Sequence, residues 1–192
     1  MLELRKIAST FSGVTVQEAD GGTARFVRLS DLSDLKAGRK PVLAAGEAPT
    51  VARALPIEDG DLIIGARGAA TDVCLATPGM LGAFVSLDLY LVRPDVSKVA
   101  PGYLVAVLEL PATQVLFAGG KQGSGLARLP KDALENVPIP LPPLPQQRLI
   151  AELAESFNDE DRLLKRLADL NSILGREAIA RAIRAVNQRQ NS

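Results

Sequence analysis

The side chains of this chain that could bind or react are mostly basic and short polar residues placed beside glycines. Arg67 follows a short apolar run and lies between Gly65 and Gly68. A second glycine-rich segment, 119–125, contains Lys121, Gln122 and Ser124. Arginine, lysine and short polar groups hydrogen-bond to phosphates and base edges, and glycine lets the backbone approach them closely. Taken alone, each segment fits either contact with a nucleic acid or a solvated, flexible connection.

Catalytic chemistry has little support in the sequence. The chain contains no histidine, so histidine-based triads and histidine metal sites are excluded. Glu58, Asp59 and Asp61 could form the carboxylate cluster of a nuclease, but no lysine follows at the usual spacing and a turn explains them better. Cys74 has no histidine base and is expected to be a small core residue. We expect no catalytic residue and no metal site, and a hydrolase would need a pocket that the sequence does not indicate.

The totals describe an ordinary globular chain without a charge bias. Its 192 residues suffice for one full-sized domain, or one domain with an appendage. Basic and acidic residues number 22 each, which argues mildly against a protein that coats DNA. The balance still allows a protein that contacts DNA through basic residues gathered on one face. We find one cysteine, no signal peptide and no apolar run of about 20 residues. We therefore expect a cytoplasmic protein with no membrane partner.

Residues 1–140 have the pattern of short strands separated by turns. Alternation predicts a strand over 24–29, a short buried strand over 61–65 and one long strand over 83–93. In the long strand, Leu87 is expected on the apolar side and Asp88 on the opposite side.

The same region also contains helical patterns. Pro101 should open a helix whose apolar face is formed by Leu104, Val105 and Leu108 and extends to Val115 and Leu116. A second short helix is expected near 130–134. Together with the strands, these helices predict a mixed α+β domain with a mostly local, antiparallel sheet.

Residues 146–187 have the composition of a long helix, with one glycine and no proline. A heptad-like seam is formed by Ile150, Leu153, Phe157, Leu164, Leu167 and Leu174, with Glu160 and Asn171 at seam positions between them. A second stripe is formed by Leu163, Leu170, Ile173, Ile179, Ile183 and Val186. An apolar surface this wide must be covered, and we expect the covering helix to come from another copy or another protein. A break near Asn158 is left open.

A proline cluster, 138–145, joins the two regions. Its prolines stiffen the chain and prevent a helix from forming before Gln146 and Gln147. The run could be a polyproline ligand, but a stiff hinge is the better interpretation. The stretch 134–153 resembles the end of a target recognition domain in type I restriction-modification specificity subunits, where I-P-L-P-P-L-x-x-Q leads into a long helix.

Three other stretches resemble the same family in the same order. They are 55–68 with its Gly-Asp-Leu-Ile-Ile, 83–94 ending in Arg-Pro, and 101–129 with its Tyr-Leu helix and glycine-bearing loop. A usual specificity subunit carries two recognition domains and two long helices, whereas this chain has one of each. The helix entry has Gln146 where the family often has glutamate, and no helix precedes the domain. The chain therefore resembles a half-length subunit.

This resemblance implies a recognition domain over 1–140, followed over 141–192 by a proline hinge and a helix that pairs with another helix. It implies a non-catalytic reader of double-stranded DNA that needs no cofactor. An adenine methyltransferase subunit carrying S-adenosylmethionine would dock on the helix, and a motor-nuclease subunit can join the assembly. A homodimer would imitate the family's pseudo-twofold, antiparallel arrangement and read two inverted, gapped half-sites.

The resemblance and the loop positions together give a set of expected DNA contacts: Ser12, Thr15, Arg25, Arg28, Arg67, Lys121, Gln122, Ser124 and Arg128. Arg25 and Arg28 are an odd number of residues apart in one predicted strand, so at most one of them should face DNA. The alternative function is a scaffold or regulator that binds no DNA and acts through its helix. The zero net charge favours this alternative.

Overall fold

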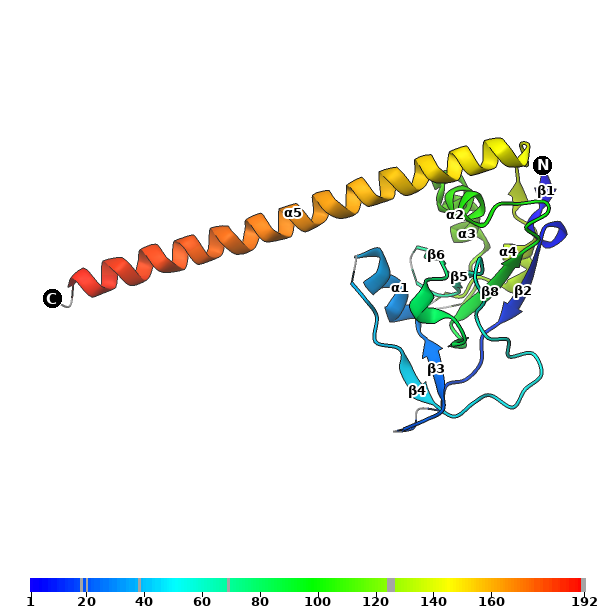
Figure 1. The fold of residues 1–192 in the computed structure, drawn as a ribbon, viewed down its shortest axis with the longest axis horizontal. Coiled ribbons are helices and arrows are strands. Elements are labelled where there is room, and N and C mark those ends of the chain that lie inside the picture. The colour runs from blue at the N-terminus through cyan, green and yellow to red at the C-terminus, as the bar shows by residue number, and fades with distance from the viewer. Residues whose placement is uncertain (18, 20, 38, 69, 124–126, 191–192) are drawn as a thin grey trace. The chain divides into compact units, whose positions relative to one another are not determined.

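The computed structural model describes residues 1–17, 19, 21–37, 39–68, 70–123 and 127–190, with the backbone alone for 182 and 185–190. The chain forms two compact units, Met1–Ala154 and Glu155–Ser192. The strands and shorter helices lie in the first unit (Figure 1). The second unit consists of the later part of helix α5, Leu144–Gln190.

The largest sheet has four strands in the order β2, β8, β5, β6, all paired antiparallel. The strands are β2 Ala8–Ser12, β8 Leu89–Pro94, β5 Leu62–Gly65 and β6 Val73–Leu75. Strand β8 is buried on both faces, because Tyr90 and Val92 pack into one hydrophobic cluster and Leu89 and Leu91 into another. A strand covered on both sides buries successive residues, which explains its unbroken apolar run.

The single long strand predicted over 83–93 is wrong, because two strands lie there. Strand β7 spans Phe84–Val85, and a turn at 86–88 separates it from β8. The turn is closed by the Leu89 N–H, which donates to the Ser86 carbonyl at 2.9 Å. Leu87, predicted on the buried side, is 46% exposed. The chain turns here because β7 and β8 belong to different sheets.

Two smaller sheets complete the first unit. One has the order β4, β3, β7, with β4 at Ala44–Gly46 and β3 at Ala24–Val27, and β3 runs parallel to β7. The other pairs β1, Leu2–Glu3, with β9, Pro138–Ile139. Among the described strands, this parallel pair is the exception to antiparallel pairing, so the predicted mixed, mostly antiparallel α+β fold is confirmed. The sheets are less local than predicted, because β1 and β2 pair with distant segments.

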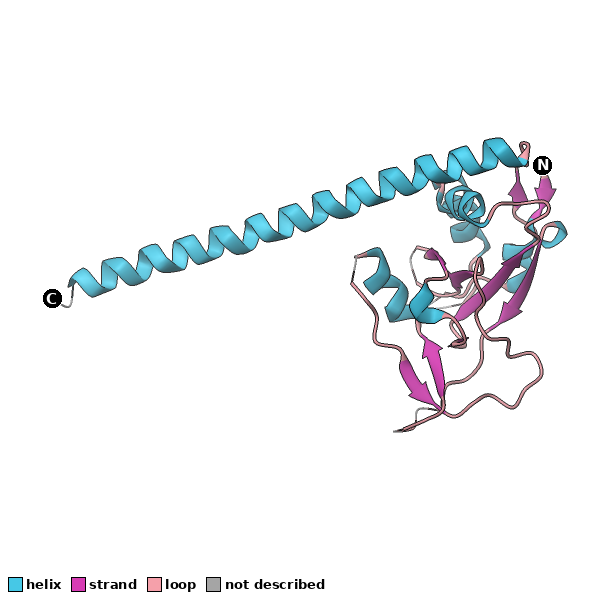
Figure 2. Cartoon of the chain, in the orientation of Figure 1, coloured by secondary structure: helices cyan, strands magenta, loops and turns pink. Residues whose placement is uncertain are grey.

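The shorter helices are drawn in cyan in Figure 2 and comprise α1 Leu29–Lys36, α2 Pro101–Glu109, α3 Pro111–Gly120, α4 Lys131–Glu135 and the 3-10 turns η1 Leu4–Lys6 and η2 Pro78–Met80. No single described helix is long and apolar enough to cross a membrane, although the bent pair α2 and α3 meets that test together.

The helix predicted from Pro101 is shorter than expected. Helix α2 ends because Leu110, which precedes Pro111, is extended with φ −57° and ψ 140°. Val115 and Leu116 therefore belong to α3 and are exposed, so their assignment to the apolar face of α2 is wrong. Helix α3 also includes positions 119 and 120, which shortens the predicted glycine-rich loop. A Cβ at Gly120 would lie 3.1 Å from Ala133 Cβ, so a glycine there lets α3 pack on α4.

An ion pair fastens β8 to the segment before β5. The Asp61 side chain is 1% exposed and receives the Arg93 Nε–H and Nη2–H, both at 2.8 Å. Its carboxylate also accepts the Glu58 N–H at 2.8 Å. Hydrogen bonding to Asp61, followed by the charges of Asp61 and Glu58, outweighs burial and raises the pKa of Arg93. These carboxylates therefore stabilise a turn and a strand pairing.

The buried side chain of Gln147 fixes the start of α5 within the first unit. Its Nε2 donates to the Pro142 carbonyl at 2.8 Å and the Lys98 carbonyl at 3.1 Å. Its Oε1 accepts the N–H of Ala100, the N-cap residue of α2, at 2.9 Å. Ala151, one turn later, packs against Gly102. These contacts explain why the first unit extends to Ala154 instead of ending at the prolines. Asn158 lies inside α5 and does not begin a new helix.

Candidate nucleic-acid interface

Several predicted DNA contacts meet at one end of the four-stranded sheet. The pairing register places Ser12, at the end of β2, opposite Tyr90, and Gly65, at the end of β5, opposite Leu89. The ends of β2 and β5 therefore flank the start of β8 and the turn before it. We call this turn, Ser86-Leu87-Asp88, the hub turn.

Arg67 and Arg128 both reach the hub turn through Asp88. The Arg67 Nε–H donates to Asp88 Oδ1 at 2.6 Å, and Arg128 Nη1 lies 3.7 Å from the same oxygen. The backbones of the two arginines form an antiparallel bridge. The Ala66 N–H donates to the Asp88 carbonyl at 2.8 Å, and the Leu129 N–H donates to the Ala66 carbonyl at 2.8 Å. Three segments distant in the sequence are thus joined around one carboxylate.

Arg128 is held by further contacts besides the carboxylate. Its Nη1 donates to the Leu87 carbonyl at 3.0 Å. Its guanidinium carbon lies 5.4 Å from the centre of the Tyr90 ring, a distance at which a cation is attracted to an aromatic face. Tyr90 is itself fixed, because its hydroxyl donates to the Leu129 carbonyl at 2.8 Å. Arg128 therefore presents a restrained guanidinium that is still partly exposed.

Lys121 and Gln122 border the same place. Lys121 Nζ donates to the Gly68 carbonyl at 2.7 Å, which ties the segment after α3 to the loop that carries Arg67. Burial lowers the pKa of Lys121, and the Asp72 carboxylate acts against this shift. The Gln122 N–H and carbonyl exchange hydrogen bonds of 2.9 Å with Arg128, so its backbone positions Arg128. Ser124 lies outside the described residues.

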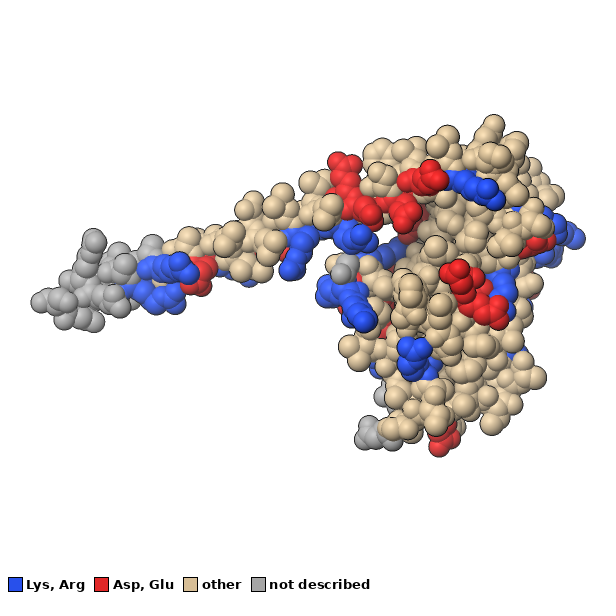
Figure 3. Space-filling model, in the orientation of Figure 1, with Lys and Arg blue, Asp and Glu red and all other residues tan. Residues whose placement is uncertain are grey.

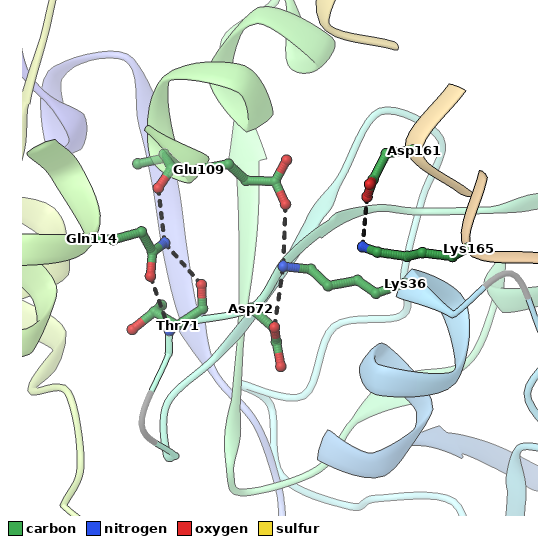
Figure 4. Close-up of polar contacts among 8 residues, drawn as sticks. Lys36, Thr71, Asp72, Glu109, Gln114, Asp161 and Lys165 are labelled. Carbon is green, nitrogen blue, oxygen red and sulfur yellow. Dashed lines mark hydrogen bonds and ion pairs between the residues drawn. The ribbon is translucent and has the colours of Figure 1, made fainter. Parts of the chain in front are cut away.

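The loop that carries Arg67 is anchored at its far end, as Figure 4 shows. The Gln114 side chain accepts the Thr71 N–H at 3.1 Å and donates to the Thr71 carbonyl at 2.9 Å. Next to it, Lys36 Nζ lies 3.1 Å from Asp72 and 3.2 Å from Glu109. Burial acts to lower the pKa of Lys36, but the two carboxylates outweigh it and raise that pKa. The loop is therefore held by α1, α2 and α3 together.

Ser12 and Thr15 flank a close contact with the hub turn. A Cβ at Gly13 would lie 1.9 Å from the Ser86 carbonyl oxygen, so the chain passes the turn at a distance that suits glycine alone. The Gly13 N–H donates to the Leu89 carbonyl at 3.1 Å. Thr15 is exposed just beyond it. The stretch 12–15, predicted as a recognition loop, thus lies beside the hub turn.

Arg25 and Arg28 have different surroundings. Arg25 donates from Nη1 to the Gly79 carbonyl at 2.9 Å and from Nη2 to the Leu81 carbonyl at 2.7 Å. Its guanidinium thus fastens β3 to the segment around η2. The Arg28 N–H donates to the Asp31 carboxylate at 2.7 Å at the start of α1. The Ser86 N–H donates to the carbonyl of Val27, the residue before Arg28. Arg28 therefore lies nearer the hub turn than Arg25 does.

The charges on the face drawn in Figure 3 are mixed, with basic and acidic side chains interspersed among uncharged residues. The described residues include no group of three or more histidine, cysteine, aspartate or glutamate side chains placed to hold a metal. A hollow beside Ser12, Gly13 and Phe84 offers about 10 Å³, the space of about one water molecule. The Asp88 side chain in the hub turn is 46% exposed and therefore lies at the surface.

Comparison with known proteins shows which family the chain belongs to. The family model described as the type I restriction modification DNA specificity domain matches residues 17–171. This chain belongs to that family. No curated protein matches the chain.

Three solved structures resemble this specificity domain. A chain from a study of complex assembly and conformational transition of the type I R-M system shares 21% identity with a TM-score of 0.65, over 91% of this chain and 42% of that chain. The HsdS subunit from Thermoanaerobacter tengcongensis shares 21% with a TM-score of 0.59, over 87% and 39%. The type I S subunit from M. genitalium shares 12% with a TM-score of 0.59, over 88% and 41%. The chain spans about two fifths of the length of these relatives, and the likeness confirms the fold.

The second unit of this specificity domain presents the predicted apolar stripes. All six seam residues are exposed, with Phe157 at 62% and Leu174 at 66%. The described residues of the second stripe, Leu163 to Ile183, are exposed as well. The side chain of Val186 lies outside the description. An apolar surface of this extent typically marks a protein–protein contact.

Several important residues of the domain were missed at the level of sequence. Asp88 was treated as a polar position of a strand, although it joins Arg67 and Arg128. The sequence did contain a sign of the turn, because Ser86 and Asp88 interrupt an apolar run. Such polar residues are as typical of a turn as of an alternating strand. Tyr90 and Gln114 gave no signal, because their roles depend on segments that are distant in the sequence.

Proposed function

We propose that this chain is the DNA-sequence-reading subunit of a type I restriction-modification complex. The observation that carries the proposal is the meeting of Arg67, Lys121, Gln122 and Arg128 at the hub turn, in a chain of the DNA specificity family. Arginine and lysine donors at the end of a sheet can contact phosphates and base edges together. Residues 1–140 would form the recognition domain and 141–192 the hinge and partner helix.

The proposed assembly carries its chemistry on other subunits. An adenine methyltransferase subunit, with S-adenosylmethionine bound, would transfer the methyl group, and a motor-nuclease subunit can join the same complex. The proposal is supported by the likeness to a chain from the type I R-M assembly study. The chain would act in the cytoplasm, where it selects the DNA site and performs no group transfer itself.

The apolar stripes of α5 support a homodimer in which two copies pair antiparallel. The part of the seam from Phe157 to Leu174 is symmetric about the point between Lys165 and Arg166, so that Leu164 would face Leu167 and Phe157 would face Leu174 of the second copy. Ile150 and Leu153 lie outside this symmetric part. The two polar seam residues, Glu160 and Asn171, would also face each other. A parallel pair would instead place Glu160 against Glu160, which repels.

The charge pattern of α5 favours the same direction. Residues 152–161 include five acidic and no basic side chains, whereas residues 162–184 include six basic and two acidic side chains. Antiparallel pairing brings the acidic segment of each copy beside the basic segment of the other. Such complementarity selects the orientation of paired helices more than it increases their affinity.

Salt dependence separates the DNA reader from the scaffold. The full chain is titrated into a labelled random-sequence duplex, with fluorescence anisotropy measured at several salt concentrations. A reader should bind with an affinity that falls steeply as salt rises, since each phosphate contact contributes about −0.9 to the slope of log K against log salt. Absence of binding at the lowest salt would favour the scaffold.

Light scattering tests the homodimer, first with the chain alone and then with a candidate methyltransferase subunit added. A dimer that captures the methyltransferase supports the proposed assembly, and a monomer that ignores it overturns the assembly. In a Cys74→Ala background, an equal mixture of Phe157→Cys and Leu174→Cys chains should cross-link across an antiparallel seam. Cross-linking of Phe157→Cys chains with each other would instead indicate a parallel pair.

A further inference from the structure

We propose that Asp88 is a positioning residue for base reading, which holds Arg67 and Arg128 as an oriented pair. Without the Asp88 carboxylate, the two guanidinium groups would bind backbone phosphates of a duplex of any sequence. This inference rests on the proposed DNA-reading function and adds a specificity-determining residue to it.

The backbone of Asp88 is held in place by hydrogen bonds from two directions. Asp88 lies in the hub turn, which Leu89 closes through its hydrogen bond to Ser86 at 2.9 Å. The Asp88 carbonyl accepts the Ala66 N–H at 2.8 Å, immediately before Arg67. On the other side, the bridge between Arg67 and Arg128 fixes the distance between the two arginine backbones. The backbone position from which the carboxylate extends is thus defined by contacts that do not involve the guanidinium groups.

Both arginines meet the same carboxylate oxygen in different ways. Arg67 donates through Nε at 2.6 Å, which turns that edge of its guanidinium toward the carboxylate. Arg128 approaches through Nη1 at 3.7 Å while its guanidinium lies over the Tyr90 ring. A guanidinium reads guanine through two donors in one plane, so the orientation of that plane decides whether it discriminates between bases.

The exposure of the three side chains suits contact with DNA. Arg67 is 35% exposed, Arg128 29% and Asp88 46%. Pairs this exposed contribute little to folding stability, because water screens them. The Asp61 carboxylate, at 1% exposed, pairs with Arg93 inside the fold and stabilises it, whereas the exposed Asp88 carboxylate would set the direction of two surface guanidinium groups. The carboxylate also offsets one of two adjacent positive charges, which weakens attraction to phosphates that carry no sequence information.

The experiment compares two duplexes, one recovered by selection from a random pool and one of random sequence. Affinities of the full chain for both are measured by fluorescence anisotropy at several salt concentrations. The variants are Asp88→Asn, Asp88→Glu and Arg67→Lys. The matched control is Asp34→Asn, which removes a carboxylate from an exposed ion pair with Arg39 elsewhere on the same unit. Thermal unfolding is recorded for every variant.

Asp88→Asn should bind the random duplex more tightly, with a salt slope steeper by about one unit, and its preference for the selected duplex should fall about tenfold. Asp88→Glu should recover part of that preference. Arg67→Lys keeps the charge but loses the planar donor pair, so it should lower the preference without tighter binding to random DNA. Asp34→Asn should leave the preference unchanged.

A different result would overturn the inference. If Asp88→Asn and Arg67→Lys keep the wild-type preference within twofold, Asp88 does not orient base readers, while DNA reading itself still stands. If Asp88→Asn loses affinity for both duplexes equally, its role is structural. If the wild-type chain shows no preference between the duplexes, the proposed function and this inference fail together.

Discussion

Gln147 should contribute more to the stability of the first unit than any exposed residue of α5. Its side chain makes three hydrogen bonds, to the Ala100 N–H and to the Lys98 and Pro142 carbonyls, while it is 1% exposed. Replacement by alanine leaves these backbone groups without their partner inside the fold. At about 1 kcal/mol for each hydrogen bond, the loss is about 3 kcal/mol.

The neighbouring residue provides a matched control. Gln146 has the same side chain and the same place in the first turns of α5, but it is exposed. Gln146→Ala should change the free energy of unfolding by less than about 0.5 kcal/mol. Gln147→Met keeps the approximate shape without the amide, so it separates lost hydrogen bonds from lost packing.

Urea unfolding followed by circular dichroism measures the three variants against the wild-type chain. For Gln147→Ala, a loss of about 3 kcal/mol corresponds to a fall in melting temperature of about 6–12 °C in a chain of this size. Gln147→Met should lose nearly as much. If both Gln147 variants are as stable as Gln146→Ala, the hydrogen bonds do not hold the start of α5 to α2, and our account of the junction is wrong.

Four further predictions test other features of the structure. Arg93→Met leaves the buried Asp61 carboxylate without its cation and should cost about 3 kcal/mol of unfolding free energy. Arg39→Met, which breaks the exposed pair with Asp34, should cost at most about 1 kcal/mol. Equal losses in urea unfolding would show that the Asp61–Arg93 ion pair does not stabilise the fold. Burial raises the pKa of Cys74 from its ordinary 9.0 to about 12, so iodoacetamide at pH 8 should alkylate the folded chain about 10³-fold more slowly than the chain in urea; comparable rates would show an accessible thiol. Because the folded pKa is the higher one, stability from the neutral thiol is full below pH 9.0 and is lost as the pH rises towards about 12, and Cys74→Ala should remove this part of the pH dependence of urea unfolding. Leu164→Glu combined with Leu167→Glu should turn the proposed dimer into a monomer in light scattering, with Lys165→Gln as the control that stays dimeric; a double variant that remains dimeric places the interface elsewhere.

Local patterns were sufficient to predict most elements of the fold. The helix starts at Pro101 and near Lys131 and the buried strand after Gly60 all follow from short-range signals. The proline cluster also indicated the long helix, but α5 begins at Leu144 and not at Gln146 as predicted, because a proline such as Pro145 is accepted in the first turn of a helix. The prediction was wrong where a proline or a turn interrupts a regular pattern. Pro111 ends α2, and the hub turn divides the alternating run 83–93.

The candidate interface could be predicted only in part. Basic residues beside glycines indicated Arg67 and Lys121, because those features are local in the sequence. The fold brings together segments that are far apart in the sequence, and no spacing rule reveals the contacts that result. These include the contacts of Asp88 and Tyr90 with arginines and the hydrogen bonds from Arg25 to two backbone carbonyls. Similarly, the proline motif indicated a helix start, but the role of Gln147 required the position of α2.

The central claim, that this chain reads DNA sequence, is tested most directly by selection from a pool of random duplexes. The full chain is mixed with the pool, the bound duplexes are recovered and sequenced, and the cycle is repeated. Our account predicts that the recovered duplexes share one motif of two inverted half-sites separated by a constant gap. Recovery of duplexes without any common motif, at an affinity that depends on salt alone, would contradict it.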